Sequence, residues 1–457
     1  MLRNTAITLL ALAFAAHAAA NTLEVGPGKM YPTIIAAYAK AGKGDVIKVY
    51  PQKNGAAYDQ VAIWANKPNI TFLGVPSKPG ERIKICGKGF NYSGTSPTPR
   101  AIFQFDIGAD NNTLEGFELY GAHNDSHNGA GVRIDQANHV TVRNCEVHNN
   151  DMGTQSNGPI GLAVDQLFEN CLYHHNGDPT DAGQNHNFYL GGTSVTLRGC
   201  ELHSPLTGHN FKSRAHVNWI EFCYIHDSLN REFDLVDSAE TTAPESHSVL
   251  IGNVIVKSPS CANHDVIQFG QDGGKEHHGT LYLVHNTVLA SGKSMFIDLS
   301  AGKTGVRMYD NIIDGGGTFV NVRNGADMKN VTCENNWIAG SFNTGGFNRG
   351  NTVGKPGAKL ELTGHGDFHL RHTPNNVANG GTDEQKWDLP APPYGKNGPS
   401  LASSKPMGST LPKLATEGPA GARFLSWQYK DPAQFEPRPP SKKPDLGAHD
   451  LSHRGAP

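Results

Sequence analysis

One pattern occurs four times in the middle of the chain, as Arg143-Asn-Cys-Glu-Val-His148, Glu169-Asn-Cys-Leu-Tyr-His174, Arg198-Gly-Cys-Glu-Leu-His203 and Glu221-Phe-Cys-Tyr-Ile-His226. The steps between successive cysteines are 26, 29 and 23 residues. The frame continues without cysteine at Gly252-Asn-Val-Ile-Val, His285-Asn-Thr-Val-Leu, Asp310-Asn-Ile-Ile and Glu334-Asn-Asn-Trp-Ile. Repetition at this period is typical of a solenoid, in which each repeat buries its apolar face against its neighbours.

A second family of short strands precedes these segments. Its members are Val132–Asp135, Leu162–Asp165, Phe188–Gly191, Phe211–Arg214, Phe233–Val236, Ile267–Gly270 and Ile297–Ser300. Because side chains alternate along a strand, the first and third residues of each member point inward and the other two outward. Stacked coils pair equivalent strands in parallel about 4.8 Å apart, so inward residues form columns. We expect one column of Cys145, Cys171, Cys200 and Cys223, and another of Phe188, Phe211 and Phe233.

The cysteine column is interpreted as core packing, because Cys behaves as a small buried apolar residue. A disulfide between neighbouring coils and a metal site are the alternatives. The histidines that end the repeated pattern are on the outward phase, at positions 148, 174, 203 and 226. We interpret them as a stacked, solvated row, with a row of metal ligands as the alternative.

The ends of the chain fit a solenoid. The segment Tyr31–Gly42 predicts an amphipathic helix that covers the open end of the first coil. The sequence therefore predicts an all-β fold, a single-stranded right-handed parallel β-helix with an N-terminal capping helix and an irregular C-terminal tail. The expected parts are a signal peptide in residues 1–20, the cap and first coil in 21–75, the β-helix in 76–350, and an irregular region in 351–457 that packs on or follows the solenoid.

The first residues and the composition bound the setting. Arg3, an apolar stretch and the small residues around Ala18 predict a signal peptide, and therefore a secreted or periplasmic protein. No later segment is apolar enough to cross a membrane. The net charge of -3 provides no global field for nucleic acid, so an acidic ligand needs a local basic patch. The seven cysteines are too few for a disulfide scaffold. We expect the protein to be a monomer.

Over residues 22–350 the chain resembles the pectate-lyase-like superfamily of right-handed parallel β-helix proteins. Two segments of the tail add to this resemblance, Gly366-Asp-Phe-His-Leu-Arg371 and Lys443-Pro-Asp-Leu-Gly-Ala-His449. The superfamily includes lyases, hydrolases, esterases, epimerases and non-catalytic adhesive proteins. The resemblance therefore implies the fold and leaves the reaction to the residues of the site.

Reactive side chains crowd onto the outward phase of the second strand family. The first outward position gives Arg133, Ala163, Tyr189, Lys212, Asp234, Gln268 and Asp298, and the next gives Asp135, Asp165, Gly191 and Arg214. His186, His209 and Arg231 directly precede three of the strands. The mixture of cations, imidazoles and a phenol is local to residues 186–237. We expect it to form one groove that binds an acidic polysaccharide.

This mixture suits a polysaccharide lyase that cleaves a uronic-acid-containing polysaccharide by β-elimination. The reaction needs a cation on the substrate carboxylate, a base for the neighbouring proton and an acid for the leaving oxygen. The predicted catalytic residues are Lys212 as the base, Arg231 as the neutralising cation, and Tyr189 and His209 as the acid or an alternative base. Like charges on Arg214 and Arg231 are expected to favour neutral Lys212. The predicted substrate-binding residues are Arg214, His186, Asp234 and Arg133.

Some lyases of the superfamily use a Lys and an Arg on neighbouring coils, often with calcium held by carboxylates. Lys212 and Arg231 fit that scheme, but Pro205-Leu-Thr-Gly-His-Asn210 contains no carboxylate. We therefore expect no metal or other cofactor, with calcium at Asp234, Asp237 and Glu240 as the alternative. A glycoside hydrolase would use two of Asp135, Asp165, Asp234 and Asp237. A C5-epimerase or a non-catalytic carbohydrate-binding protein would also be compatible with this fold.

Overall fold

A computed structural model describes residues 20–354, apart from 96, 182, 348 and 349, and the short segments 361–364, 367–372, 389–393, 427–430 and 434–437. The predicted signal peptide lies outside these residues except for its last position. Most of the region 351–457 lies outside them as well. Its described parts include two antiparallel hairpins, β36 (Glu361–Gly364) with β37 (Asp367–His372) and β38 (Trp427–Lys430) with β39 (Gln434–Pro437).

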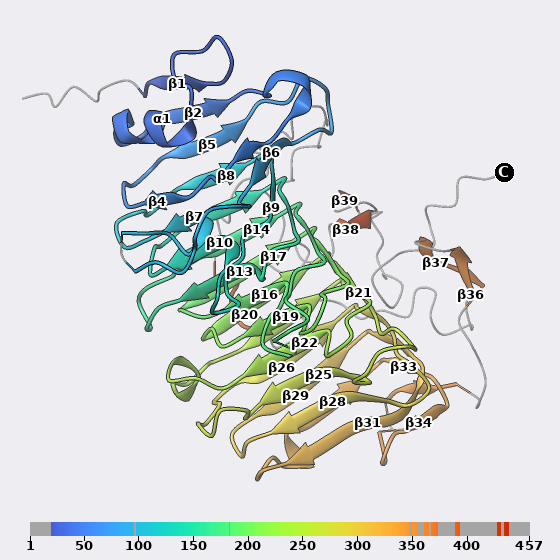
Figure 1. The fold of residues 1–457 in the computed structure, drawn as a ribbon. Coiled ribbons are helices and arrows are strands. Elements are labelled where there is room, and N and C mark those ends of the chain that lie inside the picture. The colour runs from blue at the N-terminus through green and yellow to red at the C-terminus, as the bar shows by residue number, and fades with distance from the viewer. Residues whose placement is uncertain are drawn as a thin grey trace, which may run out of the picture.

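Three long parallel sheets run along the solenoid, and every coil except the terminal ones contributes one strand to each sheet (Figure 1). The first sheet contains β1 (Thr22–Val25), β2 (Val46–Val49), β5 (Thr71–Gly74), β8 (Thr113–Glu115), β11 (Thr141–Arg143), β14 (Gln166–Glu169), β17 (Ser194–Arg198), β20 (Val217–Glu221), β23 (Ser248–Ile251), β26 (Thr280–Val284), β29 (Gly305–Tyr309) and β32 (Val331–Glu334). The second sheet contains β4 (Ile63–Ala65), β7 (Ala101–Phe105), β10 (Ala130–Asp135), β13 (Met152–Asn157), β16 (Phe188–Leu190), β19 (Phe211–Ser213), β22 (Phe233–Val236), β25 (Asp265–Gly270), β28 (Ser294–Ser300), β31 (Gly316–Arg323) and β34 (Ser341–Asn343).

The third sheet contains β3 (Tyr58–Asp59), β6 (Ile83–Cys86), β9 (Phe117–Tyr120), β12 (Glu146–His148), β15 (Leu172–His174), β18 (Glu201–His203), β21 (Tyr224–His226), β24 (Val254–Val256), β27 (Thr287–Leu289), β30 (Ile312–Asp314), β33 (Trp337–Ile338) and β35 (Thr352–Val353). Three short 3-10 helices lie at Lys53–Gly55, Glu240–Thr242 and Met328–Asn330. The strand order confirms the predicted parallel β-helix.

A single residue in the left-handed conformation starts the corner between the first and third sheets. Its φ is 52° at Asn144, 54° at Asn170, 57° at Gly199 and 64° at Gly252. Asn and Gly tolerate this conformation better than other residues, which explains why they recur before the repeated strand. Phe222 adopts the same conformation with φ 55°, although a bulky side chain disfavours it.

The predicted cysteine column is confirmed. Cys145, Cys171, Cys200 and Cys223 are fully buried, and the structure shows them as free thiols rather than disulfides. Neighbouring coils pair in register at this column. The residue that follows each cysteine donates its backbone N–H to the carbonyl of the cysteine one coil earlier, as Leu172 does to Cys145. Burial raises the pKa of the Cys171 and Cys200 thiols well above its usual value. These thiols therefore act as packing groups.

In the coils that follow Cys223, asparagine takes the place of cysteine in this column. Asn253, Asn286, Asn311 and Asn336 are fully buried. The side-chain amide of each donates to the amide oxygen of the next, at 3.0 Å from Asn253 to Asn286 and 3.0 Å from Asn286 to Asn311. The ladder satisfies polar groups that would otherwise be costly to bury. The same position of the coil therefore accepts either a buried thiol or a buried, hydrogen-bonded amide.

The second sheet contains the expected aromatic column and one strand that the sequence did not predict. Phe188, Phe211 and Phe233 pack in successive coils, with ring centroids 5.9 and 5.8 Å apart. The predicted strand Leu162–Asp165 is wrong, because these residues form a turn and β13 takes the place in the sheet. The inward residues of β13 include Thr154 and Ser156, whose polarity hid the strand from a hydrophobic pattern.

The expected N-terminal helix is present as α1 (Ile34–Lys40) at the end of the solenoid (Figure 1). It begins later than the predicted segment because Thr33 is its N-cap, with the side-chain oxygen accepting from the Ala36 N–H at 3.2 Å. Ile34, Ala37 and Tyr38 are buried, and the Tyr38 ring stacks on Phe72 of the next coils at 5.7 Å. The helix therefore covers apolar surface as expected.

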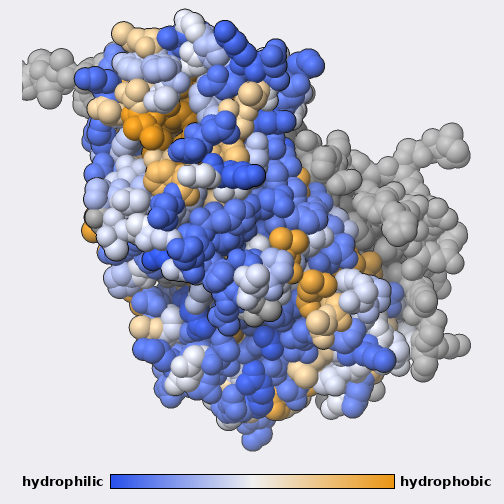
Figure 2. Space-filling view, in the orientation of Figure 1, coloured by the Kyte–Doolittle hydropathy of each residue, from blue (hydrophilic) through white to orange (hydrophobic). Residues whose placement is uncertain are grey.

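One face of the molecule is seen in the space-filling view of Figure 2. The face in Figure 2 is largely hydrophilic, with small apolar patches, several of them near the N-terminal coils. Within the described part of the chain, every helix is too short or too polar to span a membrane.

Candidate functional site

The outward face of the second sheet brings the predicted polar residues into one column. The register pairs Arg133 with Gln155, Gln155 with Tyr189, Tyr189 with Lys212, and Lys212 with Asp234. Gln155 of β13 therefore takes the place predicted for Ala163. The strands β16, β19 and β22 belong to adjacent coils and present Tyr189, Lys212 and Asp234 side by side.

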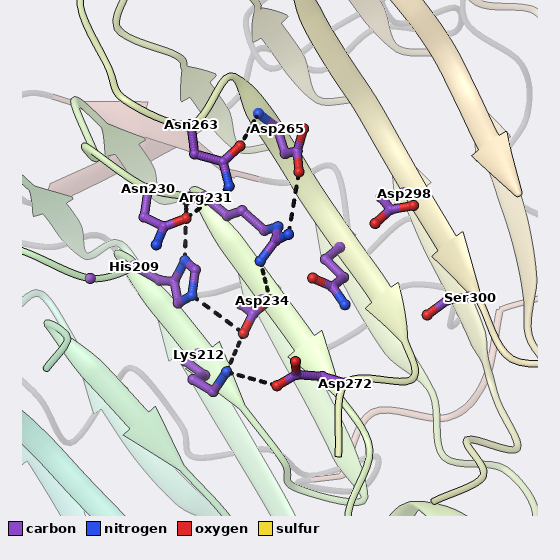
Figure 3. A network of polar contacts seen from close by, with 12 residues as sticks. His209, Lys212, Asn230, Arg231, Asp234, Asn263, Asp265, Asp272, Asp298 and Ser300 are labelled. Carbon is purple, nitrogen blue, oxygen red and sulfur yellow. Dashed lines mark hydrogen bonds and ion pairs between the residues drawn. The ribbon is translucent and has the colours of Figure 1, made fainter. Parts of the chain in front are cut away.

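Lys212 contacts two carboxylates, each of which it shares with a neighbouring arginine. Its Nζ contacts the Asp234 side chain on the next coil, and Asp272 Oδ2 at 3.3 Å from a loop after β25 (Figure 3). The sequence predicted the two arginines beside this amine but not its carboxylate partners, and each arginine is itself paired with a carboxylate.

The two arginines flank Lys212 and share its partners. Arg231 contacts Asp234 Oδ1 and Asp265 Oδ2, both at 3.3 Å. Arg214 contacts Asp272 Oδ2 at 3.0 Å through Nη2, and its Nε donates to the phenolic oxygen of Tyr189 at 3.1 Å. Asp237 Oδ1 also lies 3.9 Å from Arg214 Nη1, so the site is a network of three cations, four carboxylates and one phenol.

Asp234 is the centre of this network. It contacts Lys212, Arg231 and the ring of His209, whose Nε2 lies 3.4 Å from Asp234 Oδ2. Its side chain is only 1% exposed, so a polymer on the surface does not reach it. We assign Asp234 the role of holding the cations, in place of the predicted direct contact with substrate.

His186 and His209 form a buried stack beneath the network. Their ring centroids lie 4.9 Å apart. His186 Nδ1 accepts from the backbone N–H of His209 at 2.9 Å, and His209 Nδ1 accepts from that of Arg231 at 3.1 Å. Burial, helped by neighbouring positive charges, holds the pKa of both rings well below its usual value. Both rings are therefore neutral supports of the turn, and neither reaches the surface to bind substrate.

Arg133 lies apart from the other predicted residues. It stands three coils before Lys212, donates to Gln155 Oε1 at 2.6 Å, and has Asp135 Oδ2 at 3.9 Å from its Nε. The structure brings together Tyr189, Lys212, Arg214, Arg231 and Asp234, with the two histidines below them. Arg133 is on the same face, outside this network.

Sequence analysis missed the residues that close the site. The loop after β25 carries Asp272, and the side chain of Asp237 accepts the backbone N–H groups of Asp272, Gly273 and Lys275. A hollow of about 330 Å³ beside the network is lined by Arg231, Gln268, Gln271, Asp272, Gly274, Arg323 and Asn324. The Gly-rich run Gly270-Gln-Asp-Gly-Gly274 directly after a strand is the signal that would have indicated this loop.

Among the described residues, no group of three or more His, Cys, Asp or Glu is placed to hold a metal ion. The four outward histidines form the expected stack, with centroids 4.9, 5.1 and 4.9 Å apart. The row is not solvated as predicted, because the side chains of His148, His174 and His226 are only 16%, 17% and 12% exposed. His148, His174 and His226 each face a glutamate of the preceding coil at 3.2 to 3.3 Å.

No family model and no curated protein sequence matches the chain. Among solved structures it is similar to pectate lyase Pel9A, with 14% identity, coverage of 94% of this chain and 96% of that chain, and a TM-score of 0.43. It is similar to the pectin methylesterase PemA from Erwinia chrysanthemi (9% identity, 68% and 91% coverage, TM-score 0.33) and to Escherichia coli YbhC (13%, 77% and 88%, 0.34). The strand order and register show the chain to be a right-handed parallel β-helix protein.

Proposed function

We propose that this protein is a polysaccharide lyase that cleaves a uronic-acid-containing polysaccharide by β-elimination outside the cell or in the periplasm. One observation carries the proposal. Lys212 and Arg214 contact the same oxygen of an exposed carboxylate, that of Asp272, and the phenolic oxygen of Tyr189 is hydrogen-bonded to the same Arg214. The surface therefore offers a two-cation site for a carboxylate with a proton-transfer group beside it.

β-Elimination uses such a combination. A base removes the proton from the carbon next to the uronate carboxylate, the electron pair forms a carbon–carbon double bond, and the bond to the glycosidic oxygen breaks. The leaving oxygen takes up a proton. Negative charge builds on the carboxylate in the transition state, so cations already fixed there lower the barrier.

The contacts assign these roles within the network. Lys212 and Arg214 neutralise the substrate carboxylate, because both already hold a carboxylate oxygen. Tyr189 takes the proton, because its phenolic oxygen is held beside the carboxylate site by a hydrogen bond from Arg214 Nε. The Lys212 ammonium supplies the proton to the leaving oxygen. Arg231 fixes Asp234 and lines the hollow that continues the groove.

A glycoside hydrolase is not favoured by the positions of the carboxylates. Hydrolysis needs two carboxyl groups that flank the bond and reach it. The side chains of Asp234 and Asp237 are 1% and 0% exposed, and both are occupied by cations or backbone amides. Asp165 lies in a turn outside the second sheet. A lyase requires no second accessible carboxylate.

The test is an assay on polymers of galacturonate, of mannuronate and guluronate, and of glucuronate, with a neutral glucan beside them. Ultraviolet absorbance of the unsaturated product is expected on at least one uronate polymer and not on the glucan. Tyr189→Phe and Lys212→Ala should each lose about 100-fold or more in kcat. Lys329→Ala, at an exposed lysine remote from the network, is the control and should retain full activity.

Lys212→Arg separates the two possible roles of this residue. Partial activity in the arginine variant would mean that Lys212 only neutralises the carboxylate. Loss of activity is expected if Lys212 also transfers a proton, because arginine does not give up its proton. Saturated reducing ends would indicate a hydrolase, and inversion of the uronate without cleavage would indicate an epimerase. Tight binding without any product would favour a non-catalytic carbohydrate-binding protein.

A further inference from the structure

Asp272 differs from the other carboxylates of the network in its exposure. Its side chain is 41% exposed, whereas that of Asp234 is 1% exposed and that of Asp237 is fully buried. A single oxygen of Asp272 contacts Lys212 Nζ at 3.3 Å and Arg214 Nη2 at 3.0 Å. This is the contact that the carboxylate of a bound uronate would make with the same two cations.

The loop that carries Asp272 is fixed by its backbone. The Asp237 carboxylate accepts three N–H groups from residues 272–275. The backbone N–H of Gln271 donates to Ser300 Oγ at 2.7 Å, and that hydroxyl lies 2.9 Å from the Gln271 carbonyl oxygen. Asp272 is therefore held at the cations by the loop and does not depend on its own ion pairs for its position.

The far end of the loop is anchored as firmly. Buried His277 contacts the Ser246 carbonyl oxygen at 3.1 Å through Nε2, and the His278 N–H donates to the Thr241 carbonyl at 2.9 Å. At Gly273 a Cβ atom would lie 3.3 Å from Arg214 Nη1 and 3.4 Å from the Asp237 carboxylate. The loop therefore lies directly against the cation that it neutralises.

We infer that Asp272 is a built-in occupant of the carboxylate site and a specificity-determining residue for acidic ligands. Removing its carboxylate without replacement leaves two neighbouring cations with less compensation, which is costly. A ligand that brings its own carboxylate replaces the lost contacts, and a neutral sugar does not. Rotation of the Asp272 side chain towards solvent is enough to vacate the site. The inference uses the proposed function only for the identity of the physiological ligand.

The experiment measures binding of acetate, glucuronate and glucose by NMR titration of the full-length mature protein. Asp272→Asn removes the internal charge and keeps the shape of the side chain. We expect the variant to bind acetate and glucuronate about threefold to tenfold more tightly than the unaltered protein, because one charge at about 5 Å in a solvated site has an effect of this order. Binding of glucose should not change. Asp125→Asn, which removes one charge from an exposed position on another loop, is the matched control and should leave all three affinities unchanged.

Acetate makes the inference independent of the sugar. Equal or weaker binding of acetate by Asp272→Asn, or no acetate binding by either protein, overturns the inference even where lyase activity is found. Tighter acetate binding without activity on any uronate polymer supports the inference and counts against the proposed function. Asp272→Ala provides a second variant and should follow Asp272→Asn in direction.

Discussion

At the scale of single residues, the site depends on how its carboxylates differ. Asp234 is buried and neutralises several cations, Asp237 is buried and holds a loop, and Asp272 is exposed and faces the solvent. The aspartate side chain therefore has three different roles in this site. The burial of each carboxylate and the groups that it contacts decide which role it has. The Lys212 environment could not be predicted from its own coil, because one of its two partners is 60 residues away in sequence.

Asp234→Asn should destabilise the protein by about 2 kcal/mol. The substitution leaves Lys212 and Arg231 without their shared buried counter-ion, and partial exposure of both cations limits the loss. Urea unfolding at neutral pH measures the effect. Asp265→Asn removes only one partner of Arg231 and should cost less than about 1 kcal/mol, as the loss of a surface pair does. Equal losses in the two variants would contradict a central role for Asp234.

His277 predicts a pH dependence of stability. Burial lowers the pKa of this ring to about 4, whereas in the unfolded chain it titrates near the usual 6.5. Below pH 6.5 the unfolded state binds the extra proton, so this contribution to stability is lost as pH falls towards 4, by about 1.4 kcal/mol per pH unit at most. His277→Gln keeps a donor for the Ser246 carbonyl and removes the titration. Unfolding free energies at about pH 7, 6 and 5 should therefore fall less steeply in the variant, and parallel curves would contradict the assignment.

At the scale of elements, each column of the solenoid continues through coils whose residues differ. The position that holds cysteine in four coils holds asparagine in the following ones. Both residues are compact. The asparagine amide donates to the amide oxygen of the next coil, whereas the Cys171 thiol donates to the backbone carbonyl of Glu169 at 3.3 Å. The outward histidine row also repeats from coil to coil. Its rings stack, and three of the four histidines face a glutamate of the preceding coil.

Asn286→Ala should cost about 3 kcal/mol of unfolding free energy. Asn286 Oδ1 accepts from the backbone and side chain of Asn253, and its amide donates to the Leu250 carbonyl at 2.8 Å. Alanine leaves these buried groups without partners. Asn343→Ala at an exposed position is the control and should change stability by less than about 0.5 kcal/mol. Thermal or urea unfolding of the two variants tests the difference.

The sequence predicted those elements whose residues alternate clearly in hydrophobicity. The strands that carry Tyr189, Lys212 and Asp234 were found in this way. The strand β13 was missed because polar Thr154 fills an inward position and bonds to the buried Tyr173 hydroxyl at 2.9 Å. The loop around Asp272 was missed because periodicity describes strands and carries no information on the path of a connection.

At the scale of the whole molecule, the helix α1 closes one end of a long apolar interior (Figure 1). The exposed edge and core of a first coil would otherwise be open to other chains. We predict that deletion of residues 22–42 gives insoluble protein, as judged by centrifugation and gel filtration after expression. A soluble deletion variant that unfolds cooperatively would contradict the capping role.

The corner between the first and third sheets has one length wherever it is compared along the middle of the chain. Two residues separate β11 from β12, β23 from β24, and β29 from β30, whereas the corner between the third and second sheets varies from three residues at β12 to β13 to thirteen at β15 to β16. A corner made by one left-handed residue leaves no room for a longer loop, and the eight-residue connection from β5 to β6 near the N-terminus is built differently. The other two corners of each coil can therefore be lengthened almost freely, by evolution or by design. New ligand preferences on this scaffold will be acquired there, through loops such as the one that presents Asp272. The three sheets beneath these loops remain the same.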